Sequence, residues 1–298
     1  MPIVNPGGMW AHTVCRTPCT TAATCDSALA AKACPVTWIL LRGLAREARH
    51  WGSFAQQLSK VLASSNLIHQ VEALDLPKNG EFYQLPSPTS VPHMVEFARQ
   101  QLQQKGFKPP YSLVALSLGS MVATRWAPQY PQEITRLVLI NTSMRPFSSI
   151  TERLRPGNWL KLALLIARWG NAAYAEQSIH RLTSNQTNNY HHDLADWRGI
   201  RQDASVSAAS AVRKLWAAAR FSSGVTPLLC DCLVLSSAGD QLVNPVCSAR
   251  LASAYNAQHK QHSWAGHDLP HDDPDWVYQQ ITGWLLNKIP LICYKFNS

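Results

Sequence analysis

The sequence has few charged residues and no long uninterrupted apolar run. Only 15% of its 298 residues are charged, whereas 46% are hydrophobic, a balance that is typical of globular chains and excludes an intrinsically disordered one. The apolar run at residues 162–167, between Lys161 and Arg168, is too short to cross a bilayer. We therefore expect a globular protein with no stable membrane insertion.

Basic residues outnumber acidic ones, but they form no dense block. The chain has 27 Lys and Arg against 18 Asp and Glu, a formal net charge of +9, and no run of Lys and Arg is longer than the pair Arg213-Lys214. A diffuse positive charge raises non-specific attraction to anionic surfaces without forming the basic patch that binds nucleic acid. We expect no nucleic-acid partner.

The sequence lacks the cysteine spacing of a zinc site and lacks a secretory signal. The first four cysteines contain no Cys-x-x-Cys pair, and the first 30 residues contain no basic start followed by a long apolar stretch. A chain of this length needs no disulfides to complete a core. We expect a cytoplasmic location and reduced thiols at all eight cysteines, which are Cys15, Cys19, Cys25, Cys34, Cys230, Cys232, Cys247 and Cys293.

After an irregular N-terminal segment at residues 1–34, short apolar runs alternate with stretches of helical spacing. Continuous apolar runs with β-branched residues indicate buried strands, and apolar residues three or four positions apart indicate helices. This alternation predicts an α/β fold, with a mostly parallel sheet and helices on both faces. The expected strands are residues 36–41, 67–74, 111–116, 137–140 and 232–235, and the expected helices are residues 51–62, 91–104, 118–130, 245–255 and 276–286.

The alternation stops at residues 145–222, where only helical spacing is found. We interpret this stretch as a helical insertion within a core of residues 35–144 and 223–298. Residues 190–193, Tyr-His-His-Asp, are polar, and we expect them in a solvated loop. The helices expected in the insertion are residues 159–169, 172–182 and 208–221, with a polar break at residues 184–189.

Ser117 stands between an expected strand and an expected helix, so it is either a helix cap or a nucleophile. It is the centre of Ala115-Leu116-Ser117-Leu118-Gly119, which fits the small-x-Ser-x-Gly pattern of a nucleophile elbow. A sharp turn at the serine needs small residues two positions to either side, and Ala115 and Gly119 meet that need. The same turn aims the backbone N–H of Leu118 at the reacting oxygen.

Two later residues favour the nucleophile interpretation of Ser117. A serine hydroxyl needs a base, and the base needs an acid that orients it. Asp240 follows the strand at residues 232–235, and His267 follows Gly266 in a loop before the last helix. The order Ser117, Asp240, His267 is the order found in hydrolases that use a nucleophile elbow.

The stretch at residues 267–275, rich in Asp and His, has a second interpretation as a metal cluster. Its two prolines are at odds with a helix that would present two histidines to one ion. We interpret its acids instead as first-turn residues of the helix that contains Trp276, where the helix dipole favours negative charge.

With these residues in place, the chain resembles the α/β-hydrolase fold family, over roughly residues 35–288, and the resemblance implies that residues 145–222 form a helical lid. Residues 40–44, Leu-Leu-Arg-Gly-Leu, are similar to the family's His-Gly-x segment, whose last residue donates a second backbone N–H to the oxyanion. That role is carried over to Leu44, and Arg42 stands where the family has histidine.

Two further stretches bear on the resemblance. Residues 43–51 resemble small bacterial hydrolases of unassigned substrate. Asn141 follows the strand at residues 137–140, where the family's alternative acid would stand, and this favours Asp240 as the acid.

The resemblance implies a serine hydrolase that needs no cofactor and no metal, and that cleaves a carboxylic ester or related acyl substrate. Ser117 would attack the acyl carbonyl, His267 held by Asp240 would take its proton, and the N–H groups of Leu44 and Leu118 would hold the oxyanion. The partner expected is a small apolar acyl substrate. Acyltransferase, thioesterase and carbon–carbon bond hydrolase activities stay open, as does a non-catalytic ligand-binding or interaction protein of the same fold.

Overall fold

The computed structural model describes residues 36–63, 69–224 and 226–287. The chain divides into two units, Met1–Ala33 and Cys34–Ser298, and every element described below belongs to the second. The irregular segment expected at residues 1–34 lies outside the described residues. Among the described cysteines, Cys230, Cys232 and Cys247 are free thiols.

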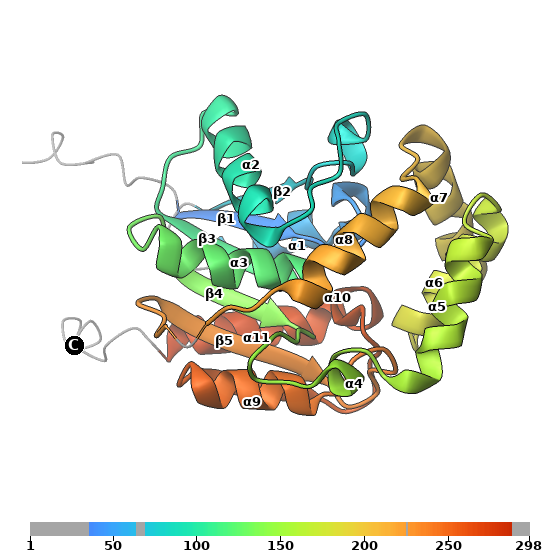
Figure 1. Ribbon diagram of the computed structural model, residues 1–298. Helices are drawn as coiled ribbons and strands as arrows, with labels where there is room; N and C mark the ends of the chain where they lie inside the picture. Colours follow the sequence, from blue (N-terminus) through green and yellow to red (C-terminus); the bar gives the residue numbers. More distant parts are fainter. Residues whose placement is uncertain (1–35, 64–68, 225, 288–298) are drawn as a thin grey trace, which may run out of the picture. The chain divides into compact units, whose positions relative to one another are not determined.

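A six-stranded sheet, in which each pair of neighbouring strands is parallel, forms the centre of the second unit (Figure 1). The strand order is β2-β1-β3-β4-β5-β6. The strands are β1 (Val36–Leu41), β2 (His69–Leu74), β3 (Tyr111–Leu116), β4 (Ile134–Ile140), β5 (Asp231–Ser237) and β6 (Gln258–His262). The expected parallel α/β sheet is confirmed.

The strand β6 is an addition to the predicted set. Its sequence, Gln-His-Lys-Gln-His, contains no apolar residue. It lies at the edge of the sheet, pairs only with β5, and leaves most of its side chains partly or fully exposed. An edge strand of this kind carries no hydrophobic pattern, because it has a neighbouring strand on one side only and most of its side chains face solvent.

Side chains alternate along each strand, so the sheet presents apolar residues on both of its faces. Helices cover both faces. On β3, Leu113 and Ala115 point into one apolar cluster, whereas Val114 and Leu116 point into the other. The first cluster is covered by α2 (Val91–Gln104), α3 (Leu118–Gln129) and α9 (Val246–Ala254), and the second by α1 (Phe54–Leu62) and α11 (Pro274–Leu286) (Figure 1). The helix expected at residues 51–62 is divided into the short 3-10 helix η1 (Ala48–Trp51) and α1.

Among the described residues between β4 and β5, five α-helices and the 3-10 helix η3 (Pro156–Asn158) follow one another, and we call this stretch the α4–α8 segment (Figure 1). It has a small apolar cluster of its own, in which Leu165, Trp169 and Leu182 are buried. Its two ends meet, because Arg145 and Ser222 form an isolated parallel bridge. The helices are α4 (Ile150–Arg153), α5 (Trp159–Ala167), α6 (Ala172–Thr183), α7 (Tyr190–Asp203) and α8 (Ala208–Arg220). The limits of the insertion at residues 145 and 222 stay a prediction.

The expectation of a solvated loop at residues 190–193 is wrong. These residues begin α7, and the helix buries Asp193, Leu194 and Trp197. The three residues share one face at helical spacing, but only two of them are apolar. A polar residue on the buried face hides the periodicity from the sequence.

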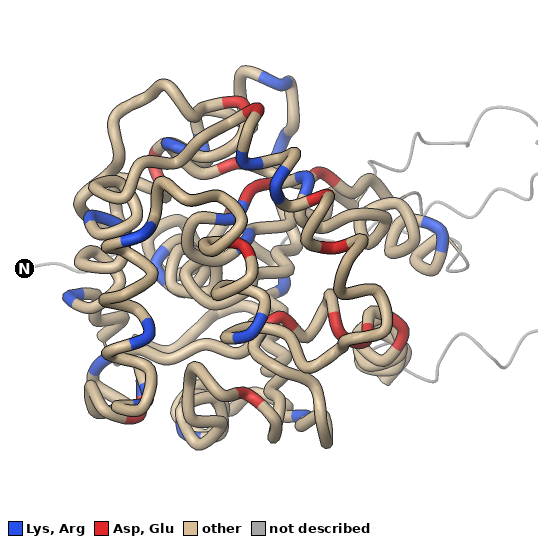
Figure 2. The backbone as a smooth tube through the Cα atoms, turned by 90° about the vertical axis from the view of Figure 1, so that its right-hand side faces the viewer, with Lys and Arg blue, Asp and Glu red and all other residues tan. Residues whose placement is uncertain are grey.

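Charged residues of both signs are interspersed along the described chain (Figure 2). Among the helices that the structure describes, none combines the length and apolar character needed to span a bilayer.

Burial in the core predicts that replacing one leucine lowers the free energy of unfolding far more than replacing another. Leu113 is fully buried in β3, whereas Leu160 on α5 is 70% exposed. We expect Leu113→Ala to lower the free energy of unfolding by about 2–5 kcal/mol, because it removes packed methyl groups and leaves a cavity. Leu160→Ala is the matched control, with an expected change within about 0.5 kcal/mol. Urea denaturation followed by circular dichroism measures both, and equal changes would contradict the assignment of β3 to the core.

Candidate active site

Ser117 lies at the turn between β3 and α3, in a strained backbone conformation. Its φ is 55° and its ψ is −111°, a region that non-glycine residues rarely occupy and that is concentrated at functional sites. Ser117 stands at the N-cap position of α3, but its side chain makes no capping hydrogen bond. The helix-cap interpretation therefore does not account for this serine.

Gly119 allows the end of β1 to pack against the turn at Ser117, and Gly43 follows β1 beside that turn. A Cβ atom on Gly119 would lie 2.4 Å from the carbonyl oxygen of Leu41, which no side chain can occupy. A Cβ atom on Gly43 would lie 3.4 Å from the Cβ and 3.9 Å from the Oγ of Ser117. The backbone that leads into Leu44 is therefore beside the serine hydroxyl.

Leu118 is the first residue of α3. The N–H of a first helical residue has no carbonyl partner within its helix and carries the positive end of the helix dipole. With Leu44 on the neighbouring loop, two backbone segments therefore flank Ser117 where an oxyanion would need donors. Their role as an oxyanion hole stays a prediction.

The structure brings Asp240 and His267 together. Asp240 Oδ2 lies 2.8 Å from Nδ1 of His267, and both residues are buried. The other carboxylate oxygen, Oδ1, accepts hydrogen bonds from the backbone N–H groups of Leu242 and Val243, at 2.8 and 2.9 Å. These two bonds fix the carboxylate, so that Oδ2 faces the ring.

The environment of His267 favours its protonated form. Burial lowers the pKa of the ring, but the negative charge of Asp240, its hydrogen bond and the charge of Asp268 outweigh burial, and the pKa is raised from 6.5. An imidazole that gains a proton easily, next to a fixed carboxylate, is suited to act as a base.

The loop after β4 holds the turn of Ser117 and the loop of His267 side by side. Thr142 Oγ1 donates a hydrogen bond to the carbonyl oxygen of Ser117, at 3.1 Å. The neighbouring Asn141 donates its side-chain N–H groups to the carbonyl oxygens of Gly266 and His267, at 3.1 and 2.9 Å. Among the hydrogen bonds of the described residues, none joins Ser117 Oγ to the His267 ring; such bonds are often long without substrate and tighten when it binds.

The model of the alpha/beta hydrolase family matches residues 38–280. The chain belongs to the alpha/beta hydrolase family. A search of curated proteins gives no match in sequence.

Solved structures of other hydrolases share the fold of this alpha/beta hydrolase. A protein provisionally named a lipase, from Acinetobacter baumannii AYE, is 24% identical with a TM-score of 0.68, and the match covers 85% of this chain and 84% of that one. A thermophilic esterase from Thermogutta terrifontis is 20% identical with a TM-score of 0.65, over 85% and 90% of the two chains. The 2-hydroxy-6-oxo-6-phenylhexa-2,4-dienoate hydrolase from Rhodococcus sp. strain RHA1 is 17% identical with a TM-score of 0.66, over 85% and 91%.

In this alpha/beta hydrolase Arg42 is buried and paired with Asp268. Its Nη1 and Nη2 donate to Oδ1 and Oδ2 of Asp268, at 3.0 and 2.6 Å, and its guanidinium lies 4.8 Å from the ring centroid of Trp51. Burial raises the pKa of Asp268, but the charge of Arg42 outweighs it and holds the pKa below its usual value. The pair ties the end of β1 to the residue that follows His267.

The interpretation of Asp268 as a first-turn residue of the last helix is therefore wrong. Asp268 precedes α10 (Leu269–Asp272), a short helix before α11, and its carboxylate is fully engaged by Arg42. The two residues lie 226 positions apart. No local pattern in the sequence connects them.

A second buried carboxylate, Asp272, fastens the α4–α8 segment to the site loops. It accepts hydrogen bonds from Ser184 Oγ and from the backbone N–H groups of Asn185, Gln186 and Gly266, the last at 2.6 Å. These residues join the connection between α6 and α7 to the loop that carries His267. The sequence interpretation missed this role, because Asp272 is one of several acids in a row.

Asn185 continues the same attachment toward the acid of the site. Its side-chain N–H groups donate to the carbonyl oxygens of Gly239 and Trp264, at 3.0 and 2.8 Å. Gly239 directly precedes Asp240. The α4–α8 segment therefore contacts the loops of both Asp240 and His267.

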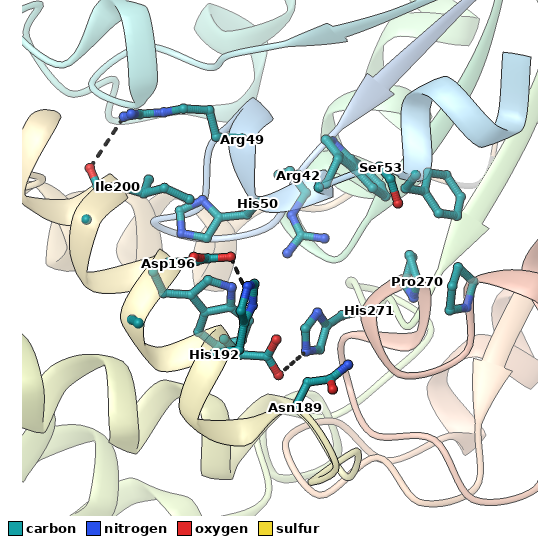
Figure 3. A pocket seen from close by; sticks show the side chains of 18 residues that line it. Arg42, Arg49, His50, Ser53, Asn189, His192, Asp196, Ile200, Pro270 and His271 are labelled. Atoms are coloured by element: carbon teal, nitrogen blue, oxygen red, sulfur yellow. Dashed lines mark hydrogen bonds and ion pairs between the residues drawn. The ribbon is translucent and has the colours of Figure 1, made fainter.

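A cavity of about 570 Å³ lies between η1, α7 and α10 (Figure 3). Its lining includes Arg42, Trp51, Trp197 and His271, but not Ser117 or the Asp240–His267 pair. It is thus next to the candidate active site, connected to it through Arg42, and distinct from the serine itself.

The Arg42–Asp268 pair predicts non-additive effects on stability. Removing either partner leaves the other charge buried and unpaired, so Arg42→Met and Asp268→Leu are each expected to lower the free energy of unfolding by about 3–5 kcal/mol. The double variant is expected to lose less than the sum of the two, because both charges are gone. Urea denaturation of the four proteins measures the coupling.

The matched control for this cycle is the exposed pair Arg250–Glu152. Arg250→Met is expected to change the free energy of unfolding far less, because water solvates the remaining carboxylate. Strictly additive losses at Arg42 and Asp268 would contradict a direct coupling between them.

Proposed function

We propose that this alpha/beta hydrolase is a serine hydrolase that cleaves a carboxylic ester or a related acyl substrate. Ser117 is the nucleophile, His267 the general base and Asp240 the group that orients His267. The backbone N–H groups of Leu44 and Leu118 form the oxyanion hole. The observation that carries the proposal is the buried Asp240–His267 pair, with its 2.8 Å contact, on loops tied to the strained turn of Ser117.

The reaction proceeds in two steps, acylation of Ser117 and hydrolysis of the acyl-enzyme. His267 takes the hydroxyl proton as Ser117 Oγ forms a bond to the acyl carbon, and the oxyanion that results is held by the two N–H groups. The intermediate collapses with cleavage of the bond to the alcohol, which receives the proton from His267 and leaves. Water then attacks the acyl-enzyme with the same help from His267, and the acid and free Ser117 are released.

The substrate is proposed to be an apolar small molecule with an acyl group, and the α4–α8 segment is proposed to act as the lid that selects it. The attachment of this segment to the loops of Asp240 and His267 supports that role. Structural relatives carry names of a lipase, an esterase and a 2-hydroxy-6-oxo-6-phenylhexa-2,4-dienoate hydrolase. Acyltransferase, thioesterase and carbon–carbon bond cleavage stay open as variants of the same chemistry. The free thiols of Cys230, Cys232 and Cys247 agree with the proposed cytoplasmic location.

One observation favours a second candidate, a non-catalytic ligand-binding protein of the same fold. The cavity of about 570 Å³ is lined by Arg42 and α7 residues and reaches neither Ser117 nor His267. A ligand in that cavity would need no chemistry at the serine. Labelling of the serine separates the two candidates.

The nucleophile assignment predicts loss of labelling and turnover on removal of one hydroxyl. Ser117→Ala is expected to abolish labelling by a fluorophosphonate probe and to lower kcat for p-nitrophenyl acetate by at least about 10⁴-fold. The matched control is Ser253→Ala, an exposed serine on α9, which is expected to behave as the wild type. Wild-type protein that neither reacts with the probe nor turns over activated esters would support the non-catalytic candidate.

The raised pKa of His267 predicts the pH dependence of the reaction. The base must be neutral to accept a proton, so kcat/KM rises as the pH passes upward through the pKa of His267. Since that pKa is raised from 6.5, the midpoint of the acid limb is expected above pH 6.5. It is measured as kcat/KM for p-nitrophenyl acetate at a series of pH values.

Asp240→Asn supplies the comparison for this profile. It removes the negative charge that raises the pKa, so the acid limb is expected to move to lower pH while the plateau of kcat/KM falls. A wild-type midpoint below pH 6.5, or an unchanged midpoint in Asp240→Asn, would speak against the assigned pair.

A further inference from the structure

Three side chains that the proposed reaction does not use meet at the border of the α4–α8 segment and the core. His180 comes from α6, Asp193 from α7 and His271 from α10. Asp193 Oδ2 lies 3.4 Å from Nε2 of His180 and 3.2 Å from Nε2 of His271 (dashed line at His271 in Figure 3). One ligand atom from each of the three residues lies within 4.8 Å of the others.

Two of the three spacings between these atoms are those of ligands around one metal ion, and the third, between the two histidines, lies within 4.8 Å. Zinc binds imidazole nitrogen and carboxylate oxygen at about 2.0–2.2 Å in tetrahedral geometry, so two ligands of one ion are separated by about 3.3 Å. The two contacts of Asp193, at 3.4 and 3.2 Å, match that separation. Two histidines, one carboxylate and an open fourth position form a donor set that zinc uses.

Burial supports the same interpretation. His180 and Asp193 are buried, so an ion between them would be held away from bulk water. The nearby cations Arg42 and Arg46 are paired with Asp268 and Glu176. Their positive charges are therefore compensated close to the cluster.

We propose that His180, Asp193 and His271 bind a divalent transition-metal ion of the zinc class. Asp193 and His271 line the cavity of about 570 Å³, so the ion enters from that side and a water molecule from the cavity completes its coordination. The ion joins α6 and α7 to α10, whose His271 stands four positions after His267. Its binding thus holds the α4–α8 segment against the core beside the candidate active site.

The proposal is tested on the full chain, stripped of metal, by titration with Zn²⁺ against a chromophoric chelator. The wild type is expected to bind one more equivalent than His271→Gln, or to bind it at least about tenfold more tightly. His271 lies at the cavity wall with its side chain 19% exposed, and Gln is chosen because it keeps a polar side chain of similar length there. Because cysteine thiolates are also zinc ligands and the chain has eight cysteines, the difference between the two proteins is the measured quantity.

The matched control is His192→Gln. His192 is exposed on α7, directly before Asp193, and pairs with Asp196 at 3.2 Å without a third ligand. Its replacement is expected to change zinc affinity by less than about twofold. Circular dichroism and thermal melting in excess chelator establish that every variant is folded before its affinity is compared.

Cobalt and a second variant complete the test. Co²⁺ in the wild type is expected to give visible d–d absorption that is lost in both His271→Gln and Asp193→Asn, without loss of any thiolate charge-transfer band. Zinc is also expected to raise the melting temperature of the wild type more than that of either variant. If His271→Gln and Asp193→Asn bind Zn²⁺ as the wild type does, the three side chains form a hydrogen-bonded cluster only and the proposal is overturned, whatever the outcome of the Ser117 experiments.

Discussion

The buried pair of Arg42 and Asp268 is the interaction on which the geometry of the candidate site depends. Two charges withdrawn from water are costly unless each satisfies the other, so the end of β1 and the start of α10 have one low-energy arrangement. That arrangement holds Gly43 against Ser117 and fixes the position of Asp268, the residue directly after His267. The arginine stands where the resemblance predicts a histidine, holds this loop by a salt bridge, and also forms part of a cavity wall.

The parts of the site that could be predicted from the sequence are those with a local signature. Ser117 is recognisable because a sharp turn restricts the residues around it, and Asp240 and His267 because each follows an apolar strand or a glycine in a fixed order. Arg42 with Asp268 and Asp272 with Asn185 could not be predicted, because their partners lie far away along the chain. These contacts form only once the strands have been placed beside one another.

The same distinction explains which strands and helices could be predicted from the sequence. The central strands are buried on both faces and are therefore continuous apolar runs, whereas β6 is an exposed edge strand and α7 buries a carboxylate among its apolar residues. Side chains of α7 make contacts between layers: Asp193 contacts His271, and the ring centroid of Trp197 lies 4.1 Å from the guanidinium of Arg46, in the loop after β1. Hydrophobic periodicity detects packing against apolar neighbours, but not packing that polar groups mediate.

The bridge between Arg145 and Ser222 has an evolutionary consequence. Because the two ends of the α4–α8 segment lie side by side, the segment can be lengthened, shortened or exchanged between homologous genes without shifting the register of β4 against β5. Under the proposed function, the residues that select the substrate and the residues that carry out the chemistry can then diversify at different rates. A common set of strands can in this way carry unrelated substrate preferences.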